Sequence, residues 1–221
     1  MNPPGAPEPV RAFIAIAVPQ MLVEQLKQLQ RQLEADVGGD AVRWTKPDQL
    51  HLTLKFLGNV RGDGVNDLKS ALTRACAGRA PFQLTLEGLG CFPNTRTPRV
   101  VWVGITGELK PLEKLQMEID RQTQTFGDHT EERPFQPHLT IGRVKVQGKD
   151  ARRLGEAVER TTVFRPGAWL IREVELIQSK LAREGANYST LASAHLMNGN
   201  GKALTSPSSL DPKGSRRPQD R

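Results

Sequence analysis

Cysteine is scarce in this chain: Cys76 and Cys91 are the only two among 221 residues. Neither belongs to a C-x-x-C pair, so two ordinary reduced thiols in the cytoplasm are the expectation. No apolar run approaches the roughly 18–20 residues that a bilayer-spanning helix needs. The first nine residues also lack the basic start and apolar stretch of a signal peptide. These absences predict a cytoplasmic protein without a membrane partner.

Two common nucleotide-binding patterns are missing as well. The chain contains neither a P-loop nor the glycine pattern of a dinucleotide-binding turn. Histidine occurs only four times, as His51, His129, His138 and His195. No carboxylate or cysteine stands at ligand spacing from His51 or His138, which disfavours a zinc site. We therefore expect no metal and no cofactor.

The chain is basic, with a formal net charge of +7 and an isoelectric point near 9.7. This balance suits an anionic partner, although many soluble proteins are equally basic without binding nucleic acid. Residues 199–221 hold five basic and two acidic side chains. Part of the excess charge therefore belongs to the end of the chain, and the remainder is compatible with a phosphate-bearing substrate.

Composition divides the chain into three parts. Residues 1–9 include four prolines and predict a flexible arm. Residues 198–221 are rich in Gly, Ser, Pro and charge, without apolar periodicity. Such a segment buries too little apolar surface to offset the entropy of ordering it, so we expect a disordered basic tail. Residues 10–197 should form one folded domain.

Within that domain, strand patterns are interrupted by helical ones. Apolar residues at 3–4 spacing predict helices, and compact or alternating apolar runs predict strands. Because most of the strands follow one another in hairpin-like fashion, the pattern favours an α+β fold over a doubly wound parallel sheet. The predicted strands are 10–18, 42–44, 51–60, 82–92, 99–105, 138–146, 170–181 and 188–196, and the predicted helices are 19–37, 62–78, 109–126 and 150–162.

Two of the four histidines begin the same tetrad, His-Leu-Thr-aliphatic, at 51–54 and at 138–141. Threonine is too infrequent for this repeat to be expected by chance. Alternate side chains of a strand share one face, so His51 and Thr53 should lie together while the aliphatic residues enter a core. His138 and Thr140 repeat the arrangement, and Lys55 continues the polar face of the first copy. The repeat indicates two similar halves with a cleft between them.

Two imidazoles beside two hydroxyl groups suit in-line displacement at a phosphodiester. Near neutrality one ring can accept a proton from water while the other donates one to the departing oxygen. The hydroxyl groups can donate hydrogen bonds to the non-bridging oxygens. A single such histidine is more often structural, but the two copies together favour function. His129 and His195 lack the pattern, and a structural role is the better interpretation of both.

These tetrads and their flanking segments resemble the two-histidine phosphoesterase superfamily, and within it the RNA 2′,3′-cyclic phosphodiesterases, once described as 2′–5′ RNA ligases. The resemblance spans about residues 11–196, nearly the whole predicted domain. It is carried by RAFIAI at 11–16, VRWTKPDQLHLTLKFLG at 42–58, GLGCFPNTRTPRVVWVG at 88–104 and RPFQPHLTIGRV at 133–144. The proline-rich arm and the basic tail are not part of the family pattern.

The resemblance implies a bilobal α+β fold with the two tetrads facing each other across a central cleft. It also implies that an RNA 2′,3′-cyclic phosphate is opened to a 2′-phosphate. His51 then resembles the proton donor to O3′, and His138 resembles the acceptor that activates water. Arg143 resembles a family arginine near the substrate, although strand parity places it opposite His138 unless the strand bulges there.

Other features of the flanking segments remain open. Arg99 could contact phosphate or serve the scaffold, and Trp102 is interpreted as a core residue. Phe13, Phe56 and Phe135 could stack on a base, although aromatic residues beside apolar strands are more often core.

Alternative functions share the same histidines. One is action on a 2′–5′ linkage or a small cyclic nucleotide. Another is a nucleotide- or RNA-binding module without turnover, which the two intact tetrads argue against. The expected partner is an RNA end, and we expect a monomer with no obligatory protein partner.

Overall fold

Nine strands form one continuous antiparallel sheet in the computed structural model, which describes residues 7–38, 40–129, 131, 133–161, 164–182 and 185–197. The strand order is β7-β4-β5-β6-β3-β1-β8-β9, with the short β2 paired to β6. The predicted α+β class is confirmed. The strands are β1 (Val10–Ala17), β2 (Val42–Trp44), β3 (His51–Val60), β4 (Phe82–Phe92), β5 (Val100–Gly107), β6 (His138–Val144), β7 (Gly167–Ile171), β8 (Glu173–Ala182) and β9 (Gly185–His195).

The helices lie close to their predicted positions. The main ones are α1 (Gln20–Val37), α2 (Val65–Cys76), α3 (Leu109–Gln122) and α4 (Gly148–Arg160), with short 3₁₀ turns η1 (Pro47–Gln49) and η2 (Gly62–Gly64). None of the helices in the described part of the chain is long and apolar enough to cross a bilayer. The predicted tail at 198–221, and residues 1–6 of the predicted arm, lie outside the described residues.

One predicted strand, 170–181, is two strands in the structure. The break falls at Arg172, between β7 and β8. β7 pairs with β4 and β8 pairs with β1 and β9, so the two segments lie in different parts of the sheet. Arg172 remains tied to the sheet, because its carbonyl accepts a hydrogen bond of 2.7 Å from the Leu196 amide. Neither glycine nor proline stands at this break, so the sequence carries no turn signal there.

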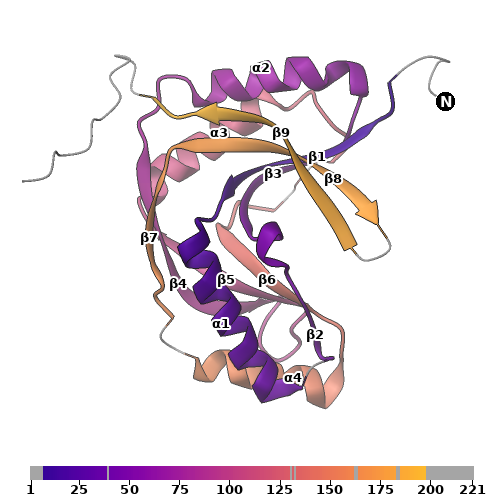
Figure 1. The fold of residues 1–221 in the computed structure, drawn as a ribbon, viewed down its shortest axis with the longest axis vertical. Coiled ribbons are helices and arrows are strands. Elements are labelled where there is room, and N and C mark those ends of the chain that lie inside the picture. Colours follow the sequence, from indigo (N-terminus) through magenta and orange to yellow (C-terminus); the bar gives the residue numbers. More distant parts are fainter. Residues whose placement is uncertain are drawn as a thin grey trace, which may run out of the picture.

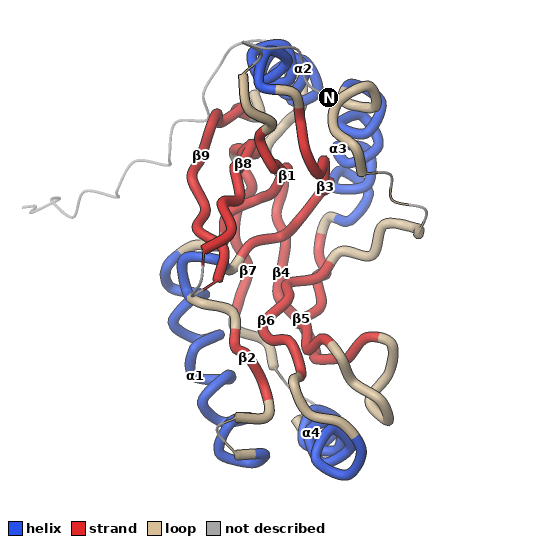
Figure 2. The backbone as a smooth tube through the Cα atoms, turned by 90° about the vertical axis from the view of Figure 1, so that its right-hand side faces the viewer, coloured by secondary structure: helices blue, strands red, loops and turns tan. Residues whose placement is uncertain are grey.

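The strand order is symmetric about the boundary between β3 and β6. Moving outward from that boundary, β3 corresponds to β6, β1 to β5, β8 to β4 and β9 to β7. Each side carries its own pair of helices: α2 and α3 contact each other on one side, and α1 and α4 do so on the other. Figures 1 and 2 show the two helix pairs at opposite ends of the curled sheet.

We call the part formed by β1, β3, β8, β9, α2 and α3 the His51 lobe, and the part formed by β2, β4, β5, β6, β7, α1 and α4 the His138 lobe. The lobes do not coincide with the two halves of the sequence, because each takes elements from both. For example, α1 follows β1 along the chain but packs with α4 in the other lobe. The chain therefore crosses repeatedly between lobes, which ties them together.

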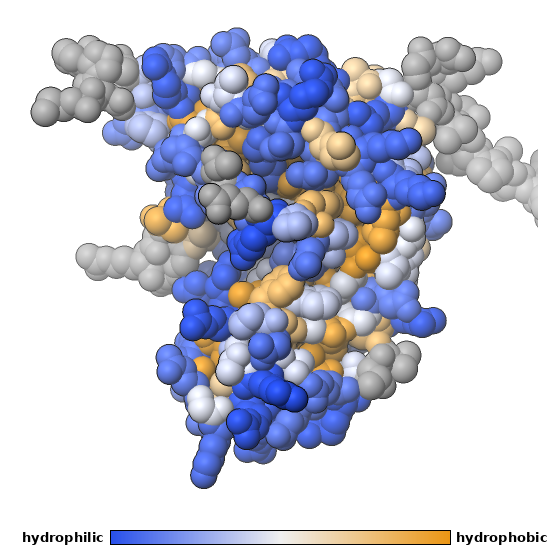
Figure 3. Space-filling view, turned by 180° about the vertical axis from the view of Figure 1, so that it is seen from behind, coloured by the Kyte–Doolittle hydropathy of each residue, from blue (hydrophilic) through white to orange (hydrophobic). Residues whose placement is uncertain are grey.

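The helices contribute apolar stripes to one main core. In α1 the predicted stripe of Leu22, Leu26, Leu29 and Leu33 is buried. Fully burying a side chain of this size contributes roughly 1.5–3 kcal/mol. A separate small cluster of Phe13, Ala15 and Ile177, with Tyr188 against it, is distinct from this main core. Hydrophilic residues cover both ends of the molecule, and apolar surface gathers nearer the middle (Figure 3).

Candidate active site

The two tetrads begin neighbouring strands of the sheet. β3 and β6 are antiparallel and pair through Leu52 and Leu139, which are both fully buried. Side chains adjacent to a buried strand residue project from the opposite face. The histidine and threonine of each tetrad flank its leucine, so all four polar side chains share the face away from the main core. In an antiparallel pair with this register, His51 and His138 occupy diagonal positions, whose Cα atoms lie roughly 7–8 Å apart.

Both imidazole rings are held by the same type of hydrogen bond. Nδ1 of His51 lies 2.7 Å from the Gln49 carbonyl oxygen, and Nδ1 of His138 lies 2.7 Å from the Gln136 carbonyl oxygen. A carbonyl only accepts hydrogen bonds, so each Nδ1 carries the proton that it donates. Within the described residues neither Nε2 has a hydrogen-bond partner. Nε2 is therefore the reactive nitrogen of both rings.

His51 is enclosed by aromatic side chains. The Phe13 ring stacks on it, with ring centroids 4.7 Å apart and planes inclined by 28°. The Tyr188 ring meets it edge-on at 5.6 Å. Burial lowers the pKa of His51 to about 4, although the hydrogen bond to Gln49 opposes the shift. The His51 imidazole is therefore neutral near pH 7.

His138 has different neighbours. Phe92 meets its ring edge-on at 5.0 Å, and Trp102 lies with its ring centroid at 6.5 Å. Trp102 pairs with Thr140 across β5 and β6 and is only partly buried. The prediction that Trp102 is a core residue is therefore wrong, since the side chain lines the histidine face. Its indole N–H is buried and has no hydrogen-bond partner in the described residues.

Each tetrad contains a β-bulge at its fourth residue. Along β3, Thr53 pairs with Ala15 and Lys55 with Ile14, which leaves Leu54 as the extra residue. Along β6, Thr140 pairs with Trp102 and Gly142 with Val101, which leaves Ile141 as the extra residue. A bulge reverses the alternation of the side chains that follow it. The tetrads therefore share a backbone irregularity in addition to their residue types.

The first bulge turns Lys55 away from the histidines. Its ammonium lies 2.7 Å from an Asp120 carboxylate oxygen on α3, and the lysine side chain is only 12% exposed. The expectation that Lys55 continues the face of His51 is wrong for this reason. Phe56 takes the histidine face instead: it is 47% exposed and its ring lies 6.0 Å from Phe13.

The second bulge turns Arg143 toward the histidines. Ile141 and Gly142 are both buried, whereas Arg143 is exposed, so the arginine returns to the face of His138. Burial raises the pKa of the Tyr188 phenol, and the positive charges of Arg143 and Arg11 oppose that rise. Simple alternation would place Arg143 on the face opposite His138, and the bulge returns it to the face of His138. The charge of Arg143 also reaches Tyr188, the tyrosine that covers His51.

A buried glutamine on α1 supports the second bulge. The Gln30 amide nitrogen donates hydrogen bonds of 2.9 Å to the carbonyl oxygens of Thr45 and Ile141. The Ile141 carbonyl also accepts a hydrogen bond of 2.9 Å from the Thr45 amide. The carbonyl of the bulged residue thus has two partners, one from a helix and one from the segment after β2.

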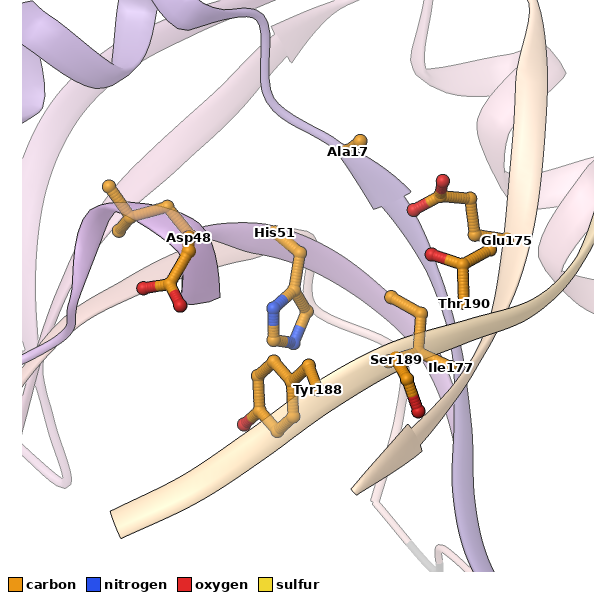
Figure 4. A pocket seen from close by; sticks show the side chains of 9 residues that line it. Ala17, Asp48, His51, Glu175, Ile177, Tyr188, Ser189 and Thr190 are labelled. Carbon is orange, nitrogen blue, oxygen red and sulfur yellow. The ribbon is translucent and has the colours of Figure 1, made fainter. Parts of the chain in front are cut away.

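A pocket of about 140 Å³ opens beside His51. Its walls come from the end of β1, from η1 and its exit, and from the hairpin of β8 and β9. Gln49 joins two of these walls, because its side-chain amide donates a hydrogen bond of 2.5 Å to the Ala186 carbonyl oxygen on β9. Figure 4 shows Tyr188 against His51, and Glu175 beside Thr190. The lining residues are Ala17, Asp48, Leu50, His51, Glu175, Ile177, Tyr188, Ser189 and Thr190.

The remaining candidates lie apart from the paired tetrads or have other contacts. Nδ1 of His195 lies 3.6 Å from a Glu173 carboxylate oxygen, and the His129 ring meets Phe56 edge-on at 6.3 Å. Arg99 is exposed, and its backbone pairs with Phe92 and Val144. Phe135 packs against the main core. No group of three His, Cys, Asp or Glu side chains in the described ranges could hold a metal ion.

Sequence reasoning missed Tyr188, Glu175 and Gln30. Tyr188 is the only tyrosine in the chain, a rarity that could have drawn attention to it. Glu175 stands among residues of a predicted strand, and Gln30 follows a leucine of the α1 stripe. Their importance depends on which strands and helices become neighbours, and no local pattern reveals that.

The sequence model of the family described as LigT like Phosphoesterase matches this chain twice, over residues 16–102 and 103–188. The chain belongs to this family. Each of the two matches contains one tetrad, which agrees with the duplication predicted from the repeat. The structural symmetry about β3 and β6 agrees with it as well.

Curated relatives in the LigT-like family are similar over most of their length. An RNA 2′,3′-cyclic phosphodiesterase of Methanothermobacter thermautotrophicus is 32% identical over 183 residues, which cover 82% of this chain and 96% of the relative. A protein of the same name from Archaeoglobus fulgidus is 30% identical over 182 residues, covering 82% of this chain and 98% of the relative.

Solved structures of similar proteins share the fold. The E. coli LigT structure with 3′-AMP matches with a TM-score of 0.68 and 28% identity, covering 86% of this chain and 99% of that chain. The structure of a Thermus thermophilus protein named TT0787 matches with a TM-score of 0.68 and 26% identity, covering 84% of this chain and 97% of that chain.

Proposed function

We propose that this protein hydrolyses RNA 2′,3′-cyclic phosphate to a 2′-phosphate, with His51 and His138 as the acid–base pair. The observation that carries the proposal is the pairing of Leu52 with Leu139. This pairing brings both tetrads to one face of one sheet, and each ring is fixed at Nδ1, while its Nε2 has no hydrogen-bond partner among the residues that the structure describes. The names of the curated relatives support the choice of substrate.

The proposed reaction is an in-line displacement at phosphorus. Nε2 of His138 accepts a proton from water as the water oxygen forms a bond to phosphorus. The bond from phosphorus to O3′ breaks, and Nε2 of His51 delivers its proton to O3′. The product keeps the phosphate on O2′. The Thr53 and Thr140 hydroxyl groups donate hydrogen bonds to the non-bridging oxygens, and Arg143 offsets their charge.

The low pKa of His51 bears on its role as the donor. Because burial lowers this pKa to about 4, the ring carries little positive charge near neutrality before substrate binds. A phosphate anion beside Nε2 favours the imidazolium form, as an opposite charge within about 4–6 Å raises the pKa of a histidine. We propose that the substrate itself thereby establishes the protonated donor.

The reaction as proposed uses no metal. The decisive experiment incubates the protein, in EDTA, with an RNA that ends in a 2′,3′-cyclic phosphate and separates the two product isomers. We expect turnover at an unchanged rate and a 2′-phosphate product. Loss of activity on chelation would contradict the metal-free mechanism, and a 3′-phosphate product would contradict O3′ as the leaving group.

The proposed function requires only one domain of the chain. We propose that residues 10–197 form the whole catalytic domain, and that the arm and the tail lie outside the site. We also propose that the protein acts as a cytoplasmic monomer without an obligatory protein partner.

A further inference from the structure

The pocket beside His51 has a fixed place relative to the reaction. His51 lines this pocket and His138 does not. In the sheet, β6 lies on one side of β3, while β1, β8 and β9 lie on the other. Three residues that line the pocket belong to these last three strands: Ala17 to β1, Glu175 to β8 and Thr190 to β9. The pocket therefore extends from His51 away from His138.

In-line displacement places the attacking and leaving oxygens on opposite sides of phosphorus. With water at His138, the ribose that carries O3′ must lie on the side of His51. This placement of the ribose rests on the proposed function and on its assignment of the two histidines. The nucleoside of the cyclic phosphate then extends toward the pocket.

The pocket chemistry suits a neutral group that donates hydrogen bonds. Asp48 and Glu175 contribute carboxylates to the lining, and these would repel a second phosphate. Burial and the charge of Glu173 raise the pKa of Glu175, and a hydrogen bond with the Thr190 side chain opposes the shift. Tyr188 supplies an aromatic wall beside His51 (Figure 4). A base that bears an amino group offers the donor that such a carboxylate accepts.

We propose that this pocket is a base subsite, in which Glu175 accepts a hydrogen bond from an exocyclic amino group of the terminal nucleoside. Its volume of about 140 Å³ is below the roughly 300–1,000 Å³ typical of drug-sized ligands, which agrees with a single ring system. Cytosine and uracil provide the cleanest contrast. Cytosine carries an amino donor at C4, whereas uracil carries a carbonyl oxygen there, which the carboxylate repels.

The test compares a short RNA that ends in cytidine 2′,3′-cyclic phosphate with the same RNA ending in uridine 2′,3′-cyclic phosphate. We expect the parent protein to prefer cytidine by roughly tenfold or more in kcat/KM, because a site built for a donor rejects an analogue that lacks it. Glu175→Gln keeps the shape but can also donate to the uracil oxygen. In this variant the kcat/KM values for the cytidine and uridine substrates should differ by no more than about threefold, while turnover of the uridine substrate is retained or rises.

The matched control is Glu173→Gln, which removes the same charge from the same strand without lining the pocket. It should keep the cytidine preference. Equal turnover of both substrates by the parent, or an unchanged preference in an active Glu175→Gln variant, would overturn the base subsite but leave the proposed function intact. Absence of turnover with either substrate would contradict the proposed function and this inference together.

Discussion

The two tetrads have the same backbone but different surroundings. Both start a strand, both bulge at the fourth residue, and both fix the imidazole through a carbonyl two residues earlier. His51 is covered by Phe13 and Tyr188, whereas His138 lies beside Phe92 and Trp102. Duplication of a strand thus supplies two histidines, while the neighbouring strands give each one its own environment.

The second residue after each bulged residue also differs between the lobes. Five residues beyond its histidine, the His51 lobe has the exposed Phe56 and the His138 lobe has Arg143. Corresponding places in the two lobes thus offer an aromatic surface and a positive charge.

The largest expected effect comes from removing either imidazole. His51→Ala and His138→Ala should each lower kcat by roughly two to four orders of magnitude, the usual scale for acid–base groups. The measurement is steady-state hydrolysis of a cyclic-phosphate RNA, with His195→Ala as the control that lies outside the tetrads. Near-full activity in either variant would show that this histidine is not an acid–base group and that the two tetrads do not have equivalent roles.

A smaller effect separates the residues that follow the two bulges. Arg143→Ala should lower kcat/KM by roughly ten- to a hundredfold, because a hydrogen bond to a charged group contributes about 1.5–3 kcal/mol. Lys55→Met should change kcat/KM by less than about threefold, since Lys55 pairs with Asp120 on α3. The reverse order of effects would show that the bulges do not direct these side chains as described.

The support of the second bulge can be tested at Gln30. Gln30→Leu should lower the free energy of unfolding by roughly 1–3 kcal/mol, since the Thr45 carbonyl loses its buried donor. It should also lower kcat/KM by roughly tenfold if a displaced bulge moves Arg143. Gln28→Leu, at an exposed position of the same helix, is the control for both urea unfolding and kinetics. A stability loss without any kinetic change would limit Gln30 to a structural role.

The different environment of His51 predicts a pH dependence of stability. Its folded pKa of about 4 lies below the unfolded value near 6.5, so the unfolded chain binds the proton more readily. The free energy of unfolding should therefore fall as the pH drops from about 6.5 to 4, by up to about 3 kcal/mol. Urea unfolding of the parent and of His51→Asn measures this contribution. Equal losses in both proteins would contradict the low pKa.

The smallest expected effect concerns the end of the chain. Deleting residues 198–221 should leave kcat and KM for a short cyclic-phosphate substrate unchanged within about twofold, because the paired tetrads lie in the domain. Binding of a longer RNA at low salt is the companion measurement, since basic residues contribute salt-dependent affinity. A large loss on the short substrate would place the tail in the site.

Local patterns in the sequence determined the elements and the chemistry. Apolar spacing predicts α1 and its buried stripe, and the repeated tetrad predicts two histidines beside two threonines on a common face. These features depend on residues close together in the chain, through the periods of the helix and the strand. The family resemblance and the α+β class rest on the same local evidence.

Only the tertiary structure decided which residues of different strands meet. The break at Arg172 sends β7 and β8 to different parts of the sheet, and the hairpin that follows brings Tyr188 over His51. The bulges reverse the alternation that had placed Lys55 beside His51 and Arg143 away from His138. A bulge arises from the pairing of one strand with another and from donors such as Gln30 on a distant helix. A single strand, considered alone, contains no information about either.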